Sequence, residues 1–352
     1  MHMADALLAP AVAATMYVAS GSAAGVSIHS IRKEERLEER PVSSKLPAMA
    51  VMSALVFAGQ MINYTIPGTG SSGHLCGGMM LSAVLGPYAG FLSMIVILAI
   101  QCLFFADGGL LALGANVWNM AFYGCFVGYF LIWRPIMRME KFSVRARIIA
   151  ASLIGCMVTL LLGAFSVVIE TSVSGITELP FGAFCAVMLP IHAAIGLVEG
   201  AITAAVLVFV YSARPELLSG VEVKGEGRFS YKATIIVLAV TALLVGGGLS
   251  LAASGNPDGL EWSLFGNEES GYGPNMGLDE DDFGVQSAAA EKAAEIQEHT
   301  AILPDYAFAS DSDNAAGTSF SGVVGSAAVA AAAALICALF GIRKKKKAQS
   351  TT

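Results

Sequence analysis

Residues 1–30 read MHMADALLAPAVAATMYVASGSAAGVSIHS and contain no lysine or arginine. The basic residues come afterwards, between Arg32 and Lys45. About 20 mostly apolar residues are enough for a helix to cross the hydrocarbon of a bilayer. A signal peptide carries its basic residues before its apolar core, not after it. We therefore expect a retained first helix over about residues 4–31, with its N-terminus outside the cell.

The composition of the whole chain points the same way. Of its 352 residues, 55% are hydrophobic and only 13% are charged, whereas a soluble globular domain has about 25% charged residues. Basic residues cluster at 32–45, 134–147, 214–232 and 343–347, and acidic residues dominate 256–313. This asymmetry sets the topology of a membrane protein in a lipid bilayer and gives no sign of nucleic-acid binding.

The number of crossings follows from placing every basic cluster on the inner side. The apolar run up to residue 105 is interrupted at Gly86-Pro87, and two segments instead of one keep all basic loops inside. We predict an all-α polytopic membrane protein, a seven-helix bundle plus two C-terminal transmembrane helices, with the N-terminus outside and the C-terminus inside. The predicted segments are 4–31, 47–66, 75–86, 88–105, 110–133, 148–169, 181–211, 233–253 and 322–340.

The same pattern divides the chain into domains. Residues 1–213 form the first transmembrane domain, and residues 214–232 form a cytoplasmic linker. Residues 233–347 form a second domain, with two helices around an external loop over about 254–321. A compact turn, Asn256–Trp262, opens that loop, and we interpret the acidic tract 279–282 as a solvated spacer.

The chemistry concentrates at the first two residues. A free amino group on Met1, the peptide nitrogen of His2 and the His2 imidazole can occupy three corners of a square, because their chelate rings are fused through a planar peptide. Planar, nitrogen-rich sites suit Ni(II) or Cu(II), and Co(II) has a lower intrinsic affinity than Ni(II).

The fourth corner needs a donor from elsewhere in the chain. His74 ends the glycine-rich stretch PGTGSSGH, residues 67–74, on the same side as Met1 if the first two helices form a hairpin. We predict it as the fourth nitrogen. The stretch is not a nucleotide-binding P-loop, because GxxxxGK[ST] occurs nowhere in the chain.

Other polar residues are candidates for supporting roles. Asp5, Gln60 and Asn63 are predicted to orient the metal ligands. His192 and Glu199 lie seven residues apart on one face of the 181–211 helix, and ionisable groups inside a membrane are functional candidates. A structural hydrogen-bonding role for this pair is the alternative.

Three stretches carry a resemblance to a known family: MHMADALL at 1–8, QMINYTIPGTGSSGHL at 60–75 and FADGGLLALG at 105–114. They resemble the nickel/cobalt substrate-binding subunits (NikM/CbiM) of energy-coupling-factor transporters, over about residues 1–211. The turn PDGLE at 257–261 is similar to the small NikN-type subunit, or PDGLE domain, here fused at the C-terminus.

The resemblance implies a substrate-binding component that takes up Ni(II) or Co(II) across the cytoplasmic membrane of a prokaryote. It implies a metal held by Met1, His2 and His74, and no catalytic residue or prosthetic group. The implied partners are a transmembrane coupling protein and two cytoplasmic ATPase subunits. The alternatives are an autonomous secondary metal-ion transporter and cobalt uptake for cobalamin synthesis. An intramembrane metalloprotease lacks its HExxH motif here.

Overall fold

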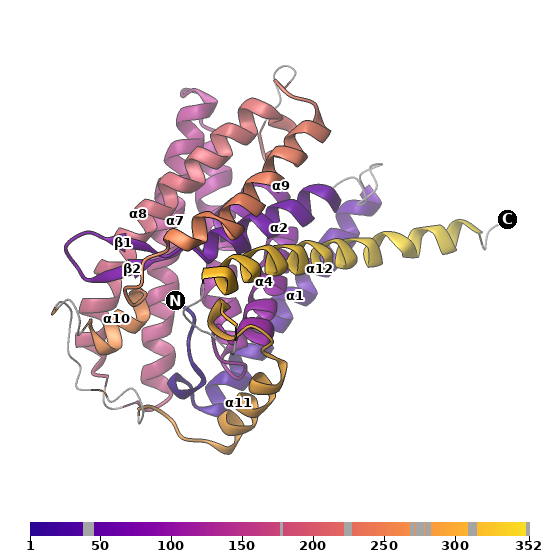
Figure 1. Ribbon diagram of the computed structural model, residues 1–352. Helices are drawn as coiled ribbons and strands as arrows, with labels where there is room; N and C mark the ends of the chain where they lie inside the picture. The colour runs from indigo at the N-terminus through magenta and orange to yellow at the C-terminus, as the bar shows by residue number, and fades with distance from the viewer. Residues whose placement is uncertain are drawn as a thin grey trace.

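The computed structural model describes residues 1–37, 46–176, 179–221, 227–267, 271, 278, 283–308 and 315–349. The fold is mostly helical, with one short β-hairpin (Figure 1). The elements are η1 (Asp5–Leu7), α1 (Pro10–Leu37), α2 (Leu46–Gln60), β1 (Tyr64–Ile66), β2 (Ser71–Gly73), α3 (Gly78–Leu85), α4 (Pro87–Phe105), α5 (Leu113–Asn116), η3 (Val117–Trp133), α6 (Arg134–Met137), α7 (Val144–Val173), α8 (Phe181–Ala213), η4 (Pro215–Leu217), α9 (Tyr231–Gly247), η5 (Leu249–Ala252), α10 (Gly259–Phe265), α11 (Ala288–Thr300), η6 (Pro304–Tyr306) and α12 (Ala315–Gln349).

Six helical segments of the described residues are long and apolar enough to cross a membrane. α2 and α9 are apolar but shorter, and the eight residues of α3 are all buried. At about 1.5 Å per residue, α3 is only about 12 Å long and cannot span hydrocarbon by itself. The six segments are Pro10–Glu34, Pro87–Phe105, Leu113–Met137, Val144–Val173, Phe181–Ala213 and Ala315–Leu339.

Small residues set how closely the helices pack. A Cβ atom added at Gly196 of α8 would lie 2.7 Å from the Cα of Met157 on α7, and one at Gly200 would lie 2.8 Å from the Cα of Leu153. Without hydrophobic drive between helices in lipid, such close backbone contact is a main source of association. These glycines hold α7 and α8 together as one rigid pair.

The two C-terminal helices pack onto the N-terminal region. α9, α2 and α12 lie side by side in Figure 1 and contact one another. α9 and α12 meet where a Cβ at Gly246 would lie 2.9 Å from the carbonyl oxygen of Gly322. The contact brings the loop between α9 and α12 over the N-terminus of the chain.

Two predicted helix boundaries next to the candidate site are wrong. Residues 1–9 are not part of the first helix: apart from the short turn η1 they are extended, and α1 begins at Pro10. The second helix ends at Gln60 instead of residue 66, and the chain continues into the β1–β2 hairpin. In both segments, bonds to distant parts of the fold replace helical hydrogen bonds. The predicted break at Gly86-Pro87 is confirmed between α3 and α4.

Two further expectations meet different outcomes. The external loop predicted to start near Glu170 begins later, because Glu170 lies inside α7 and is buried. The acidic tract 279–282 lies outside the described residues.

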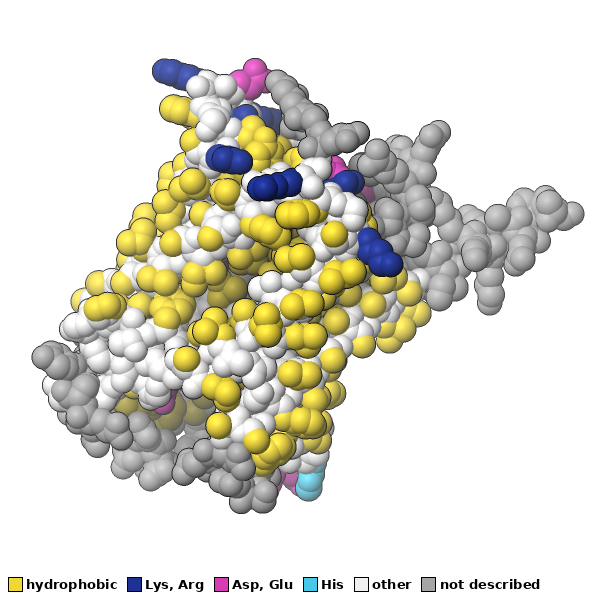
Figure 2. All heavy atoms as spheres, turned by 45° about the horizontal axis from the view of Figure 1, so that its top comes forward, with side chains coloured by type: hydrophobic (Ala, Val, Ile, Leu, Met, Phe, Trp, Pro, Cys, Tyr) yellow, Lys and Arg dark blue, Asp and Glu magenta, His cyan; other side chains and the backbone are white. Residues whose placement is uncertain are grey.

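Figure 2 shows hydrophobic side chains over most of one face of the molecule, with lysine and arginine side chains gathered at one end of this face. The α6–α7 and α8–α9 connections, which carry basic residues, lie at the top of Figure 1, away from the N-terminus.

Candidate metal site

The first residues are held in an extended conformation by one buried amide. Asn116 accepts a hydrogen bond from the Met3 backbone N–H at 2.7 Å and donates from Nδ2 to the Met3 carbonyl at 3.2 Å. The N–H of Gly109 donates to the same carbonyl at 2.9 Å. Because a buried backbone group without a partner is costly, these bonds fix the path of the segment. They deliver Met1 and His2 to the centre of the site.

The loop after the hairpin presents His74. Gln60 at the end of α2 donates to the Cys76 carbonyl at 2.8 Å. From the other side, Glu199 of α8 accepts the backbone N–H groups of Cys76 and Gly77 at 3.0 and 2.9 Å. Gly77 has φ +83°, a left-handed conformation that favours glycine. The loop is thus anchored directly after His74, at Cys76 and Gly77.

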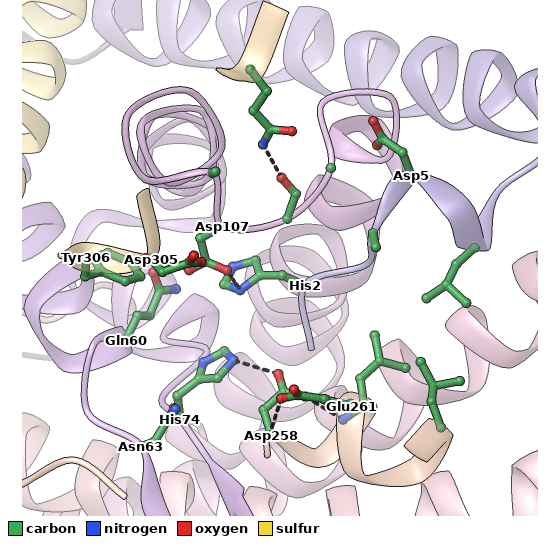
Figure 3. Close-up of a pocket in the computed structure, with 18 of the residues that line it drawn as sticks. His2, Asp5, Gln60, Asn63, His74, Asp107, Asp258, Glu261, Asp305 and Tyr306 are labelled. Atoms are coloured by element: carbon green, nitrogen blue, oxygen red, sulfur yellow. Dashed lines mark hydrogen bonds and ion pairs between the residues drawn. The ribbon is translucent and has the colours of Figure 1, made fainter. Parts of the chain in front are cut away.

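These elements bring the amino terminus and the two histidines together (Figure 3). The Met1 nitrogen lies 3.1 Å from Nε2 of His74. The His2 and His74 rings are stacked, with centroids 5.3 Å apart and planes 6° apart. With metal–nitrogen bonds of about 2 Å, neighbouring corners of a square are about 2.8 Å apart. In a chelate formed by Met1 and His2, the fourth corner of the square lies next to the amine. A separation of 3.1 Å between the Met1 nitrogen and Nε2 of His74 therefore suits two nitrogens that share one metal ion.

Asp107, which follows α4, lies behind His2. Its Oδ1 is 2.8 Å from Nδ1 of His2, and its Oδ2 accepts the Tyr306 hydroxyl at 2.5 Å. Burial alone would raise the pKa of Asp107, but the facing His2 imidazole and the bond from Tyr306 hold that pKa below its usual value. The other ring nitrogen of His2, Nε2, is buried without a hydrogen-bond partner among the described residues.

Asp258, before α10, lies on the opposite side of the site. Its Oδ2 is 2.5 Å from the Met1 nitrogen and 3.7 Å from Nε2 of His74. Burial opposes its ionisation, but the adjacent amino terminus and His74 hold the pKa of Asp258 well below its usual value. Burial, reinforced by repulsion from the Met1 ammonium, lowers the pKa of His74. A neutral imidazole is the form that binds metal.

His2 and His74 open into a cavity of about 710 Å³, which residues of the C-terminal region, Asp258 among them, also line. No lysine or arginine is among its described lining residues. The cavity therefore favours cations. Its carboxylates are Asp5, Asp107, Asp258, Glu261 and Asp305.

The predicted supporting residues have different outcomes. Gln60 and Asn63 line the cavity. Asp5 lines it too, but its Oδ1 accepts the Ala112 N–H at 2.9 Å and so anchors the N-terminal segment instead of facing the histidines. The metal ligation of Met1, His2 and His74 stays a prediction.

The intramembrane pair does not act as a pair in the described structure. Both side chains are buried in α8. Glu199 bonds to the loop after His74, whereas Nδ1 of His192 contacts the Met188 carbonyl of its own helix at 2.8 Å. The two side chains therefore make separate contacts, Glu199 with the loop after His74 and His192 with its own helix.

Four residues at the site were missed as functional candidates from the sequence: Asp107, Asn116, Asp258 and Tyr306. Asp107 and Asp258 stand in short polar turns, ADGG and PDGLE, between apolar segments, and that signal was available. Asn116 and Asn119 are two amides in an apolar helical segment, and nothing local distinguishes Asn116 as a partner of the N-terminus. Nothing local marks Tyr306, because it lies 199 residues from its partner Asp107.

Fold and site together define a multi-pass membrane protein in which the amino terminus and two histidines gather at one site. A family model described as cobalt uptake substrate-specific transmembrane region matches residues 2–217, and a PDGLE domain matches residues 232–341. The chain belongs to this cobalt uptake family and carries the PDGLE domain C-terminally. Membership places it among nickel and cobalt transport proteins.

Relatives agree with this assignment. The chain is 38% identical over 248 residues to an Archaeoglobus fulgidus protein named as a fused nickel transport protein NikMN, covering 69% of this chain and 76% of that one. It is 30% identical over 249 residues to the cobalt transport protein CbiM of Geobacter sulfurreducens, covering 69% and 70%. A crystal structure of a transition metal transporter matches with a TM-score of 0.51 and 31% identity, covering 60% of this chain and 92% of that one.

Proposed function

We propose that the chain is the substrate-binding component of an energy-coupling-factor transporter that takes up Ni(II). The Met1 amine, the His2 amide and imidazole, and Nε2 of His74 are the four donors. The observation that carries the proposal is the 3.1 Å separation between the Met1 nitrogen and His74 Nε2. A planar set of four nitrogens favours Ni(II) over Co(II), and Co(II) uptake, including uptake for cobalamin synthesis, is the second outcome of the uptake test.

The His2 ring has to turn to complete this set. Only Nδ1 closes a six-membered chelate ring with the His2 amide nitrogen, and here Nδ1 faces Asp107. Rotation about the Cβ–Cγ bond turns Nδ1 to the metal and brings the partnerless Nε2 towards Asp107. Metal-bound imidazoles commonly donate their other N–H to a carboxylate, which fixes the ring orientation.

The proposed orientation places the N-terminus and the cavity outside and the basic loops inside the cytoplasmic membrane, in accord with the positive-inside rule. A transmembrane coupling protein and two cytoplasmic ATPases supply the energy. The rival, an autonomous secondary transporter, needs an ionisable path through the bundle. His192 and Glu199 are its candidates, and their bonds to Met188 O and to the Cys76–Gly77 backbone give the rival no support.

Uptake of ⁶³Ni and ⁵⁷Co in cells tests the proposal, with the chain expressed with and without its partner ATPases. We expect nickel accumulation only with the partners, and none for His2→Ala or His74→Ala although both variants reach the membrane. A peptide tag before Met1 should be equally damaging, because it converts the amine into an amide. Normal uptake by either histidine variant would refute the ligand assignment, and uptake without the ATPases would favour the autonomous transporter.

A further inference from the structure

One carboxylate at the site comes from the C-terminal domain, not from the region that carries the proposed donors. Asp258 precedes α10 and lies 257 positions from Met1 in the chain, yet its Oδ2 is 2.5 Å from the Met1 nitrogen. Figure 3 shows Asp258 beside His74. The PDGLE turn thus reaches the N-terminal chelate directly.

The two oxygens of Asp258 have separate partners. Oδ1 accepts the backbone N–H groups of Leu260 and Glu261 at 2.7 and 2.9 Å and so caps α10. Glu261 returns the contact by accepting the Asp258 N–H at 3.3 Å, which completes a capping box. Oδ2 is left for Met1 and His74. The cap therefore fixes the rotamer that aims Oδ2 at the amino terminus.

The turn itself is fixed to the hairpin that leads to His74. The N–H of Ser72 in β2 donates to the Pro257 carbonyl at 2.8 Å, and the Ser72 hydroxyl donates to the Asn256 carbonyl at 2.8 Å. Behind the turn, a Cβ at Gly259 would lie 3.0 Å from Cε1 of His192. The backbone just before Asp258 is thus hydrogen-bonded to the strand residue two positions before His74, which fixes the two side chains next to each other.

The charge of the site suits a fixed carboxylate. An ammonium group at Met1 carries one positive charge. A divalent ion bound to a neutral amine and one deprotonated amide also has a net charge of one positive unit, because the deprotonated amide contributes −1. A metal-bound amine still has N–H groups that a carboxylate can accept. Oδ2 can hold the amine in both states without moving.

We propose that Asp258 is a positioning residue of the metal site: it aims the Met1 amine at the position next to His74 and supplies the counter-charge of the metal chelate. The C-terminal PDGLE domain thereby completes a site whose donors all belong to the N-terminal domain. This inference rests on the proposed function.

The test uses the full chain, purified in detergent and titrated with Ni(II) alone. Asp258→Asn keeps the cap, because Asn and Asp are equally good N-cap residues, but it removes the charge. Asp258→Ala removes both. Outer carboxylates of metal sites typically contribute about 10- to 100-fold in affinity, so we expect both variants to weaken nickel binding by about that factor. Glu261→Gln is the matched control: it removes an equal charge from the same turn and the same cavity, and Gln suits the capping box as Glu does. It should weaken nickel binding less than Asp258→Asn does.

The outcomes separate the roles. If Asp258 only caps α10, Asp258→Asn will bind like the wild type while Asp258→Ala will not, and the proposal fails. If Asp258 is itself a ligand, the absorption band of planar Ni(II) will change in Asp258→Asn, which also overturns it. Weaker binding with an unchanged band supports it. His74→Ala is measured alongside. If His74→Ala still binds nickel normally, the proposed function fails. If His74→Ala loses nickel binding while Asp258→Asn binds like the wild type, only the inference about Asp258 is refuted.

Discussion

Replacing Asp107 by asparagine tests whether the bond to His2 shapes the site. The change keeps the size of the side chain but removes its charge. Asp107 now serves two donors, His2 at 2.8 Å and Tyr306 at 2.5 Å. The single amide oxygen of asparagine can accept a good hydrogen bond from only one of these donors. The other donor then faces the NH₂ group, which cannot accept a hydrogen bond.

The magnitude follows from the type of bond. A hydrogen bond to a charged group contributes about 1.5–3 kcal/mol and a neutral one about 0.5–1.5 kcal/mol. The difference of about 1–1.5 kcal/mol corresponds to about a tenfold weaker binding of Ni(II). We expect the dissociation constant of Asp107→Asn to rise by about that factor, with normal insertion into the membrane.

Equilibrium binding of ⁶³Ni to the purified protein is the assay, and Asp305→Asn is the matched control. Asp305 lines the same cavity, so its replacement removes the same charge from the same space without touching the Asp107–His2 bond. If the two variants weaken nickel binding equally, only the total charge of the cavity matters, and the reasoning about the bond to His2 is wrong.

Three further results are expected. Asn116→Ala leaves the Met3 N–H without its 2.7 Å partner, and an unsatisfied buried donor costs about 1–3 kcal/mol. Nickel affinity, measured by titration, should therefore fall about tenfold or more. An unaffected affinity would show that Asn116 does not position the N-terminus. Gly259→Ala places a methyl group 2.7 Å from Cδ1 of Ile195, which should displace α10 from the β1–β2 hairpin. Cysteines introduced at exposed positions of α10 and the hairpin should then cross-link less well than the same cysteines in a chain that keeps Gly259. Equal cross-linking would contradict this. Nickel affinity should fall with acid, because protons compete for the nitrogen donors. Burial and the Met1 ammonium lower the pKa of His74, so its share of the competition should come at a more acidic pH than for an ordinary imidazole. A nickel affinity that does not change with pH would contradict the nitrogen donor set.

Much of the site could be read from the chain because its signals are local. Met1 and His2 are adjacent, and their chelating geometry follows from one planar peptide. The glycine-rich run before His74 marks a loop that can approach a ligand. The Gly86-Pro87 break is likewise a property of two neighbouring residues.

The helix boundaries near the site could not be read in this way. Residues 4–9 and 61–66 are as apolar as a helix requires, and composition assigned them to helices. Apart from the short turn η1 they are not helical, because distant groups take backbone hydrogen bonds in and beside these segments: Asn116 holds Met3, and Ser254 donates to the Asn63 carbonyl at 2.7 Å. No local pattern encodes a partner 113 residues away.

The sequence by itself determined a membrane protein of apolar helices, and it predicted that the basic loops share one side and that the first residues supply a nitrogen donor set. Only the tertiary structure decided which carboxylates face those donors. Asp107 reaches His2 because Asn116 threads the N-terminal segment beside it, and Asp258 reaches Met1 because α9 and α12 pack on α2. Hydropathy and chelate geometry act over a few residues, whereas these contacts depend on how whole helices pack.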